Sequence, residues 1–180
     1  VAQLIDSEGP VSGIGVGVAG HVNLQGELVQ SAHTSGLVGV DLVGELSRFG
    51  VPVVVGNDAN CVGLAAARLA FPDARLLLAV TLGTGIGGAI VIGGHLLVGA
   101  NGFGAEIGHM IIDRDGAPCA CGQRGCWEVT ASGSALTSAI EAALMSGELV
   151  SRTLEPGAVI TDSATRRRAA AGELASALAE

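Results

Sequence analysis

Four residues with metal-binding side chains lie close together in the sequence: His109, Cys119, Cys121 and Cys126. Thiolate sulfur and imidazole nitrogen are the ligands that zinc prefers, and four of them complete a tetrahedral structural site. The alternative interpretation is three unrelated small thiols beside a core histidine. Because four protein ligands leave zinc no open position, we expect the ion to shape this loop and to take no direct part in a reaction.

A carboxylate, Asp58, follows the apolar run VPVVV (51–55) after two residues. Such a β-branched run predicts a strand that is buried on both faces. Ligands of open α/β sheets bind beyond the carboxyl ends of the strands, which makes Asp58 a candidate general base. Asp is also a favoured N-cap, so the alternative is that Asp58 only caps the next helix. Asn57 and Asn60 beside it favour a polar ligand.

A glycine-rich turn contains Gly83, Thr84 and Gly85, within TLGTGIGG (81–88). Glycine lets backbone N–H groups face a phosphate, and threonine hydroxyls add donors. A plain glycine-rich β-turn is the alternative. The segment is not a Walker loop, because no lysine follows it. It is also not a dinucleotide fingerprint, because the third glycine is wrongly spaced and a strand is expected to follow.

Two further carboxylates, Glu106 and Glu128, flank the predicted zinc loop. Each is a plain surface carboxylate in the alternative interpretation. If zinc folds the loop back on itself, both face one pocket. Paired carboxylates together with asparagine are typical acceptors for sugar hydroxyls, so this pair predicts a sugar site.

Composition excludes several classes of protein. The chain has 180 residues, a net charge of −8, nine basic residues that are all arginine, and 49% apolar residues. Disorder and a nucleic-acid partner are therefore disfavoured, and no apolar stretch approaches the ~18 residues of a membrane helix. The cysteine spacing is poor for disulfides and the N-terminus does not resemble a signal peptide, so we expect a cytoplasmic protein without a membrane partner.

The pattern along the chain predicts an α/β protein. Strands are expected within 11–20, 26–32 and 51–55, and a strand–turn–strand–hairpin–strand unit within 76–99. Helices are expected at 37–49, 59–70 and 132–147, the last capped by Ser132, and again beyond Glu155. We place a lobe boundary near Phe71–Leu76, which gives a lobe at 1–75 with Asp58 and a lobe at 76–180 with the turn and the zinc loop.

Together these motifs resemble the ROK family (repressors, open reading frames, kinases), especially its ATP-dependent glucokinases of actinobacteria. The resemblance rests on five stretches in the family's order: IGVGVAGHV (14–22), VPVVVGNDAN (51–60), VTLGTGIGGAIVIGG (80–94), GAEIGHM (104–110) and CACGQRGCWE with the following ASG (119–133). The Glu-x-x-His pair followed by the Cys-x-Cys-Gly-x-x-Gly-Cys-x-Glu run is highly specific.

The resemblance implies a two-lobed actin-like ATPase fold (ribonuclease H-like), with a hexose and a nucleotide as partners. It implies ATP and Mg²⁺ as cofactors, structural Zn²⁺, and a homo-oligomer, either a dimer or a tetramer. Asp58 matches the base that takes the proton of the sugar's 6-hydroxyl. The remaining matches are sugar contacts at Asn57, Glu106, His109 and Glu128, phosphate contacts at Gly83, Thr84 and Gly85, and zinc ligands at His109, Cys119, Cys121 and Cys126.

The chain departs from the family pattern in several places. The family's phosphate-binding Asp-x-Gly-Gly-Thr strand is expected before Val1, and its adenosine-binding Gly-Gly loop beyond Glu180, so the chain reads as a central portion. His33 stands where the family usually has asparagine or tryptophan, and Thr130 replaces a usual tyrosine. We expect a hexokinase-type transfer, most simply to glucose. The alternatives are a sugar-sensing transcriptional regulator and a zinc-stabilised, inactive sugar-binding fragment.

Overall fold

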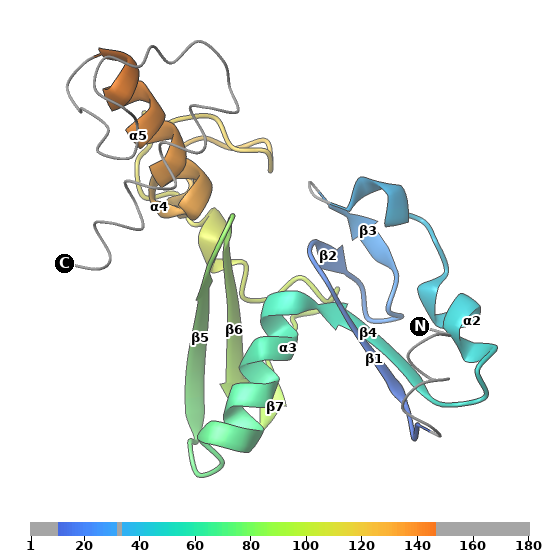
Figure 1. Cartoon of the computed structure of the whole chain (residues 1–180). Helices are drawn as coiled ribbons and strands as arrows, with labels where there is room; N and C mark the ends of the chain where they lie inside the picture. Colours follow the sequence, from blue (N-terminus) through green and yellow to red (C-terminus); the bar gives the residue numbers. More distant parts are fainter. Residues whose placement is uncertain (1–10, 32–33, 147–180) are drawn as a thin grey trace, which may run out of the picture. The chain divides into compact units, whose positions relative to one another are not determined.

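The computed structural model describes residues 11–31 and 34–146, and these residues form two compact units (Figure 1). Of the described residues, unit 1 contains 11–31, 34–81 and Gly87–Ile107, and unit 2 contains Leu82–Ile86 and 108–146. The expected helices beyond Glu155 and the departure at His33 lie outside the described residues. The mixture of strands and helices in the described residues agrees with the α/β prediction.

Unit 1 begins with a parallel pair of strands, β1 (Ile14–Val18) and β4 (Val53–Asn57), which run side by side in Figure 1. Their register pairs Ile14 with Val53 and Val18 with Asn57. Both strands therefore end at the same edge, and their carboxyl ends present Asn57 there. The short strands β2 (His21–Val22) and β3 (Leu28–Gln30) form an antiparallel pair beside them.

The core of this part consists of Val18, Val22, Leu28 and Val55. Leu42 and Val43 of α2 (Leu42–Ser47) pack against this cluster. The helix predicted at 37–49 is shorter than expected, because the chain forms a 3₁₀ turn η1 (Ser35–Leu37) and then turns at Gly39 with a φ of +77°. Asp41 restarts the helix by accepting a hydrogen bond from the Gly44 N–H at 2.8 Å.

The helix α3 (Asp58–Ala65) follows β4 without a connecting loop and continues into the π-helical turn η2 (Ala66–Ala70), so the helix predicted at 59–70 is confirmed. Small residues let α3 approach a second sheet closely. A Cβ on Gly63 would overlap the Cβ of Ala89, and it would also lie 3.4 Å from the Cβ of Ala79. The absence of a side chain at Gly63 therefore permits the close approach of α3 to this sheet.

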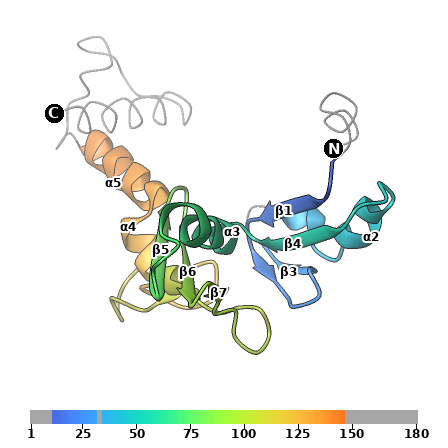
Figure 2. The same ribbon diagram turned by 90° about the horizontal axis from the view of Figure 1, so that it is seen from below.

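That second sheet has the order β5-β6-β7, with β5 (Leu76–Leu82), β6 (Ile86–Ile92) and β7 (His95–Leu96) (Figure 2). The hairpin turn at Gly93 and Gly94 has positive φ at both residues, which glycine adopts without strain. This confirms the strand–turn–strand–hairpin–strand prediction for 76–99. The glycine-rich turn joins β5 to β6.

Unit 2 contains the cysteine loop and two helices, α4 (Trp127–Ala131) and α5 (Gly133–Ser146). The Ser132 Oγ accepts a hydrogen bond from the Ala135 N–H at 3.1 Å, which confirms the predicted cap of the last described helix. Among the described residues, no helix is long and apolar enough to cross a membrane.

Candidate functional site

Asn57, and not Asp58, caps the helix α3. The Asn57 Oδ1 accepts a hydrogen bond from the Asn60 N–H at 3.0 Å. Its Nδ2 donates to the Gly20 carbonyl at 3.1 Å, which joins the cap to the chain just beyond β1. The alternative interpretation of Asp58 as the N-cap is therefore wrong, because the preceding asparagine already satisfies the free N–H group of the first turn.

Asp58 is the first residue of α3 and is exposed. One of its oxygens accepts a hydrogen bond from the neighbouring Ala59 N–H at 2.9 Å. A carboxylate in the first helical turn interacts favourably with the positive end of the helix dipole, and its exposure leaves it accessible to a ligand. Burial, and then the charge of Asp58, raise the pKa of the nearby Cys61 thiol.

Glu106 lies in unit 1, beside a histidine that the sequence analysis did not select. His21 Nε2 lies 3.7 Å from Glu106 Oε1, and the His21 ring lies 5.3 Å from the ring of Phe103, centroid to centroid. His21 comes directly after the turn that ends β1. The rule that selected Asp58, a polar residue just beyond a buried strand, would also have selected His21.

Asn60 is a second residue that the structure adds. It is buried within the first turn of α3, with a side chain whose Oδ1 has no hydrogen-bond partner among the described residues. Buried polar groups usually have a partner, so an unpaired acceptor next to Asp58 is unusual. From the sequence, Asn60 was expected only to be a polar neighbour of the candidate base.

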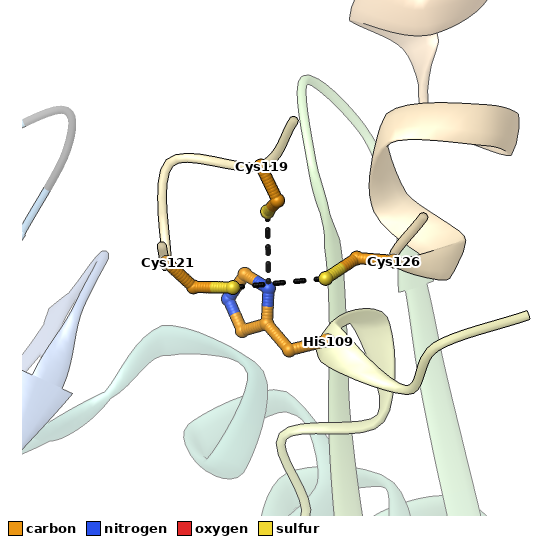
Figure 3. Close-up of side chains that lie close together, drawn as sticks. All are labelled: His109, Cys119, Cys121 and Cys126. Atoms are coloured by element: carbon orange, nitrogen blue, oxygen red, sulfur yellow. Dashed lines mark hydrogen bonds between the residues drawn. The ribbon is translucent and has the colours of Figure 1, made fainter. Parts of the chain in front are cut away.

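The four predicted metal ligands converge in unit 2 (Figure 3). Their ligand atoms all lie within 4.8 Å of one another. Cys119 Sγ lies 3.6 Å from His109 Nδ1, and Cys121 Sγ lies 3.6 Å from Cys126 Sγ. Zinc bonds of about 2.3 Å to sulfur and about 2.0 Å to nitrogen give tetrahedral edges of roughly 3.5–3.8 Å. The spacing and the chemistry of these residues therefore fit a tetrahedral metal ion.

The three thiols also influence the pKa values of one another. Burial, and then the hydrogen bonds and negative charges of the other two thiols, raise the pKa of Cys126 to about 12. Burial acts in the same direction on Cys121, but hydrogen bonds from the backbone of Gln123 and from the other thiols outweigh it and lower its pKa. Three thiolates this close repel one another unless a positive ion lies between them.

The loop that carries these ligands is held by its own backbone. The Cys119 N–H donates to the Gln123 carbonyl at 2.8 Å, and the Gly122 N–H donates to the Cys119 carbonyl at 3.0 Å. Gly122 and Gly125 have φ values of +90° and +67°, a conformation that glycine adopts without strain. Cys126 then starts α4 as its N-cap residue.

The turn of Gly83, Thr84 and Gly85 contains backbone N–H groups that are available as hydrogen-bond donors. The Gly83 N–H donates to the Gly85 carbonyl at 3.0 Å, whereas the N–H groups of Thr84 and Gly85 have no partner among the described residues. Thr84 is exposed. Two neighbouring unpaired N–H groups on an exposed turn are a suitable arrangement for binding a phosphate oxygen.

Glu128 lies on α4 in unit 2 and reaches this turn. Its Oε2 accepts a hydrogen bond from the Ile86 N–H at 2.8 Å, directly after Gly85. Its Oε1 has no partner among the described residues. The structure thus brings Glu128 to the glycine-rich turn, and this contact was not expected from the sequence.

Comparison with known proteins gives a family and a set of relatives. The pattern of the ROK family matches residues 1–179. A glucokinase of Streptomyces coelicolor is 42% identical over 125 residues, which are 68% of this chain and 39% of the relative. A putative xylose repressor of Caldicellulosiruptor is 38% identical over 169 residues, which are 89% of this chain and 42% of the relative. Kinases and repressors are thus both among the relatives.

A solved structure extends the comparison. A ROK family glucokinase from Streptomyces griseus, in complex with glucose and AMPPNP, superposes with a TM-score of 0.71 at 32% identity. The match covers 82% of this chain and 49% of that protein. The predicted α/β fold of the actin-like ATPase type is therefore confirmed. The chain spans about two fifths of the length of the curated relatives that it matches.

Proposed function

The chain belongs to the ROK family, and on this premise we propose that it is the central part of an ATP-dependent sugar kinase. The proposed reaction transfers the γ-phosphoryl group of ATP to the 6-hydroxyl of a hexose, with glucose as the first candidate. The observation that carries this proposal is the exposed carboxylate of Asp58, which heads α3 although Asn57 already supplies the cap.

Asp58 has the chemistry of the base in this reaction. Its carboxylate accepts the proton of the sugar's 6-hydroxyl while that oxygen attacks phosphorus. We propose that Asn57, Glu106, His109 and Glu128 contact the other sugar hydroxyls, as the resemblance implies. Asn57 retains one N–H and one lone pair beyond its two hydrogen bonds, so it too has capacity left for a ligand.

The turn of Gly83, Thr84 and Gly85 is the proposed phosphate contact. The unpaired N–H groups of Thr84 and Gly85 are suited to bind phosphate oxygens without a lysine. Mg²⁺ bound together with ATP would neutralise phosphate charge. Phosphoryl transfer depends mainly on positioning and charge neutralisation, which is the contribution that such a turn makes.

We propose that His109, Cys119, Cys121 and Cys126 hold a structural zinc ion. The convergence of one imidazole and three thiols within 4.8 Å supports this. Since all four positions of a tetrahedron are then taken by protein, the ion would supply folding energy to the loop and no open site for a substrate. We also propose a cytoplasmic homo-oligomer and lobes near 1–75 and 76–180.

The proposed activity can be tested directly with the complete protein. Purified protein, MgATP and glucose are expected to yield ADP and a phosphorylated sugar in equal amounts. Mannose, fructose, allose and N-acetylglucosamine are tested in parallel to identify the preferred hexose. The kinase proposal would be contradicted if the protein binds a sugar but releases no ADP with any of the sugars tested.

A sugar-sensing transcriptional regulator is the second candidate function. The similarity to a repressor over 89% of this chain favours it. The intact Leu82-Gly83-Thr84-Gly85 turn favours the kinase instead. The residues encoded before Val1 decide between them, since Asp-x-Gly-Gly-Thr indicates a kinase and a helix-turn-helix indicates a regulator.

The variant Glu106→Gln in the complete protein is expected to weaken sugar binding about tenfold to a hundredfold. The reason is that hydrogen bonds to a charged acceptor contribute ~1.5–3 kcal/mol. Zinc content and the binding constant for ATP should stay nearly unchanged, because Glu106 is not among the four clustered ligands. Calorimetric titration of glucose, with metal analysis of the same sample, measures both.

Glu45→Gln is the matched control for this variant. Glu45 is a carboxylate on α2 with 68% exposure, and its partner Arg48 lies 3.9 Å away at the surface. Loss of the Glu45 carboxylate should change neither the binding constant for sugar nor that for ATP. Unchanged sugar affinity in Glu106→Gln would make that carboxylate a bystander, and a fall in zinc content would show that the four-ligand assignment is wrong.

A further inference from the structure

Three hydrogen bonds, all within unit 2, attach the glycine-rich turn and the residue after it to the helices α4 and α5. The Ile86 N–H donates to Glu128 Oε2 at 2.8 Å. The Gly133 N–H donates to the Gly83 carbonyl at 2.8 Å, and the Ser134 N–H donates to the Thr84 carbonyl at 3.3 Å. The first turn of α5 thus uses its free N–H groups on the carbonyls of the turn, while Glu128 holds the residue that follows the turn.

Glu128 is the only side chain among these contacts, and it is partly buried. A hydrogen bond from a backbone N–H to a carboxylate is stronger than one to a neutral acceptor. The Ile86 N–H is bonded to Glu128, and the carbonyls of Gly83 and Thr84 are bonded to α5, so the N–H groups of Thr84 and Gly85 are the backbone donors of the turn without a partner among the described residues.

The position of Glu128 depends in turn on the cysteine loop. Glu128 is on the short helix α4, whose N-cap residue is the metal ligand Cys126. The Trp127 N–H donates to the Met110 carbonyl at 2.8 Å, next to the ligand His109. The helix that carries Glu128 therefore begins at one residue of the cluster, Cys126, and is bonded through Trp127 to the residue that follows another, His109.

From this geometry we propose that Glu128 is a positioning residue, which holds the Gly83–Gly85 turn in its phosphate-binding shape and is itself held in place by the metal loop. The inference deepens the proposed function and rests on it for the identity of the ligand. The hydrogen bond from Ile86 to Glu128, and its dependence on the cysteine loop, can be tested without measuring enzymatic activity.

The lack of a side chain at Gly85 leaves the space that the Glu128 carboxylate occupies against the turn. A Cβ on Gly85 would overlap Glu128 Oε2, and it would lie 3.1 Å from the Cδ of the same side chain. Gly85 is not among the residues with a positive φ, so its backbone does not itself require glycine. The absence of a side chain at this position serves the approach of Glu128.

Gly83 offers a matched comparison in the same turn. A Cβ there has no neighbour within 4 Å, and the backbone φ of Gly83 is also not positive. Gly85→Ala therefore displaces Glu128, whereas Gly83→Ala adds the same methyl group and the same loss of chain entropy without that overlap. Any difference between the two variants reports on the contact with Glu128.

The first experiment is hydrogen exchange at the Ile86 amide in the complete, zinc-loaded protein. Glu128→Ala and Gly85→Ala should each accelerate this exchange about tenfold or more, because the amide loses its charged acceptor. Glu128→Gln keeps a carbonyl oxygen that can accept the bond and should retain most of the protection. Gly83→Ala and Glu106→Ala should leave hydrogen exchange at the Ile86 amide as slow as in the parent protein.

The double variant Gly85→Ala with Glu128→Ala distinguishes loss of the contact between Gly85 and Glu128 from a general disturbance of the turn. Its exchange rate at Ile86 should match that of Glu128→Ala alone, because the methyl group then has no carboxylate to displace. Additive effects would overturn the proposal, as would unchanged exchange at Ile86 in Glu128→Ala. Unchanged melting temperatures in circular dichroism exclude global unfolding as the cause.

The second experiment removes the metal and measures the same amide. Chelation should accelerate exchange at Ile86 as strongly as Glu128→Ala does, although Ile86 lies outside the cysteine loop. Addition of zinc should restore the protection. Retention of the protection in metal-free protein would show that the loop does not hold Glu128.

The third experiment connects the turn to its ligand. Binding of Mg-AMPPNP without sugar should weaken about tenfold in Glu128→Ala and remain near the parent value in Glu128→Gln. Glu106→Gln should not change it. Equal nucleotide affinity in all variants would overturn the role in nucleotide positioning. If the parent binds no nucleotide at all, the proposed kinase function fails, while the exchange experiments still decide the contact.

Discussion

Asp58→Asn in the complete protein is expected to reduce turnover by ~10²–10⁴-fold, the usual range for loss of a general base. The amide of asparagine is almost isosteric with the carboxylate but cannot accept the hydroxyl proton. Stability should change little, because Asn57 caps α3 and Asp58 contributes only a first-turn charge of about 0.3–1 kcal/mol. Turnover and melting temperature, measured on the same preparation, test both parts.

Asn57→Ala is the informative comparison for stability. It removes the true cap and the hydrogen bond to Gly20, and we expect it to lower stability by about 1–2 kcal/mol. A variant Asp58→Asn that melts like Asn57→Ala would show a structural role for the carboxylate. Near-normal turnover in Asp58→Asn would remove Asp58 from the role of general base, and another group would then have to accept the hydroxyl proton.

Cys121→Ser is expected to lose the bound zinc and to unfold the cysteine loop. Apparent binding free energies of structural zinc reach about 10–16 kcal/mol in zinc-finger peptides, so loss of one thiolate removes a large part of the energy that folds this loop. Elemental analysis of protein purified without added metal should find about one zinc per chain in the parent and less than about half in the variant.

Cys61→Ser is the matched control, because Cys61 is exposed and lies outside the cluster of four. It should keep the zinc and the melting temperature of the parent. A parent protein without zinc, whose melting temperature does not respond to chelators, would contradict the metal assignment and also the part of the Glu128 proposal that depends on the loop.

The local features of the chain were predictable from its sequence. The run VPVVV and the glycine turns at Gly93 and Gly94 specify their strands through side-chain shape and backbone freedom, and both appear in the structure. The convergence of His109 with the three cysteines was also predictable, because short spacers restrict where one loop can place its ligands.

The predictions that were wrong, and the contacts that were not predicted, involve either two neighbouring residues that could serve the same role or residues that are far apart in the chain. Asn57 and Asp58 are both favoured caps by residue type, and their local sequence does not distinguish them; in the structure the pairing of β4 with β1 extends to Asn57, which then caps α3. The helix at 37–49 is interrupted at Gly39, where the backbone is left-handed. The bond from Ile86 to Glu128 joins residues far apart in the chain, and no local pattern encodes it.

The direct passage from β4 to α3 has a consequence for how the sugar preference of such a protein can change. Asn57 ends the strand and Asp58 begins the helix, so no loop residue separates the sheet from the candidate base. An insertion or deletion here would rotate the carboxylate away from the ligand, whereas side-chain substitutions in the loop around Glu106 leave this junction unchanged. Engineering of a new specificity should therefore diversify that loop and leave the junction at Asn57 and Asp58 intact.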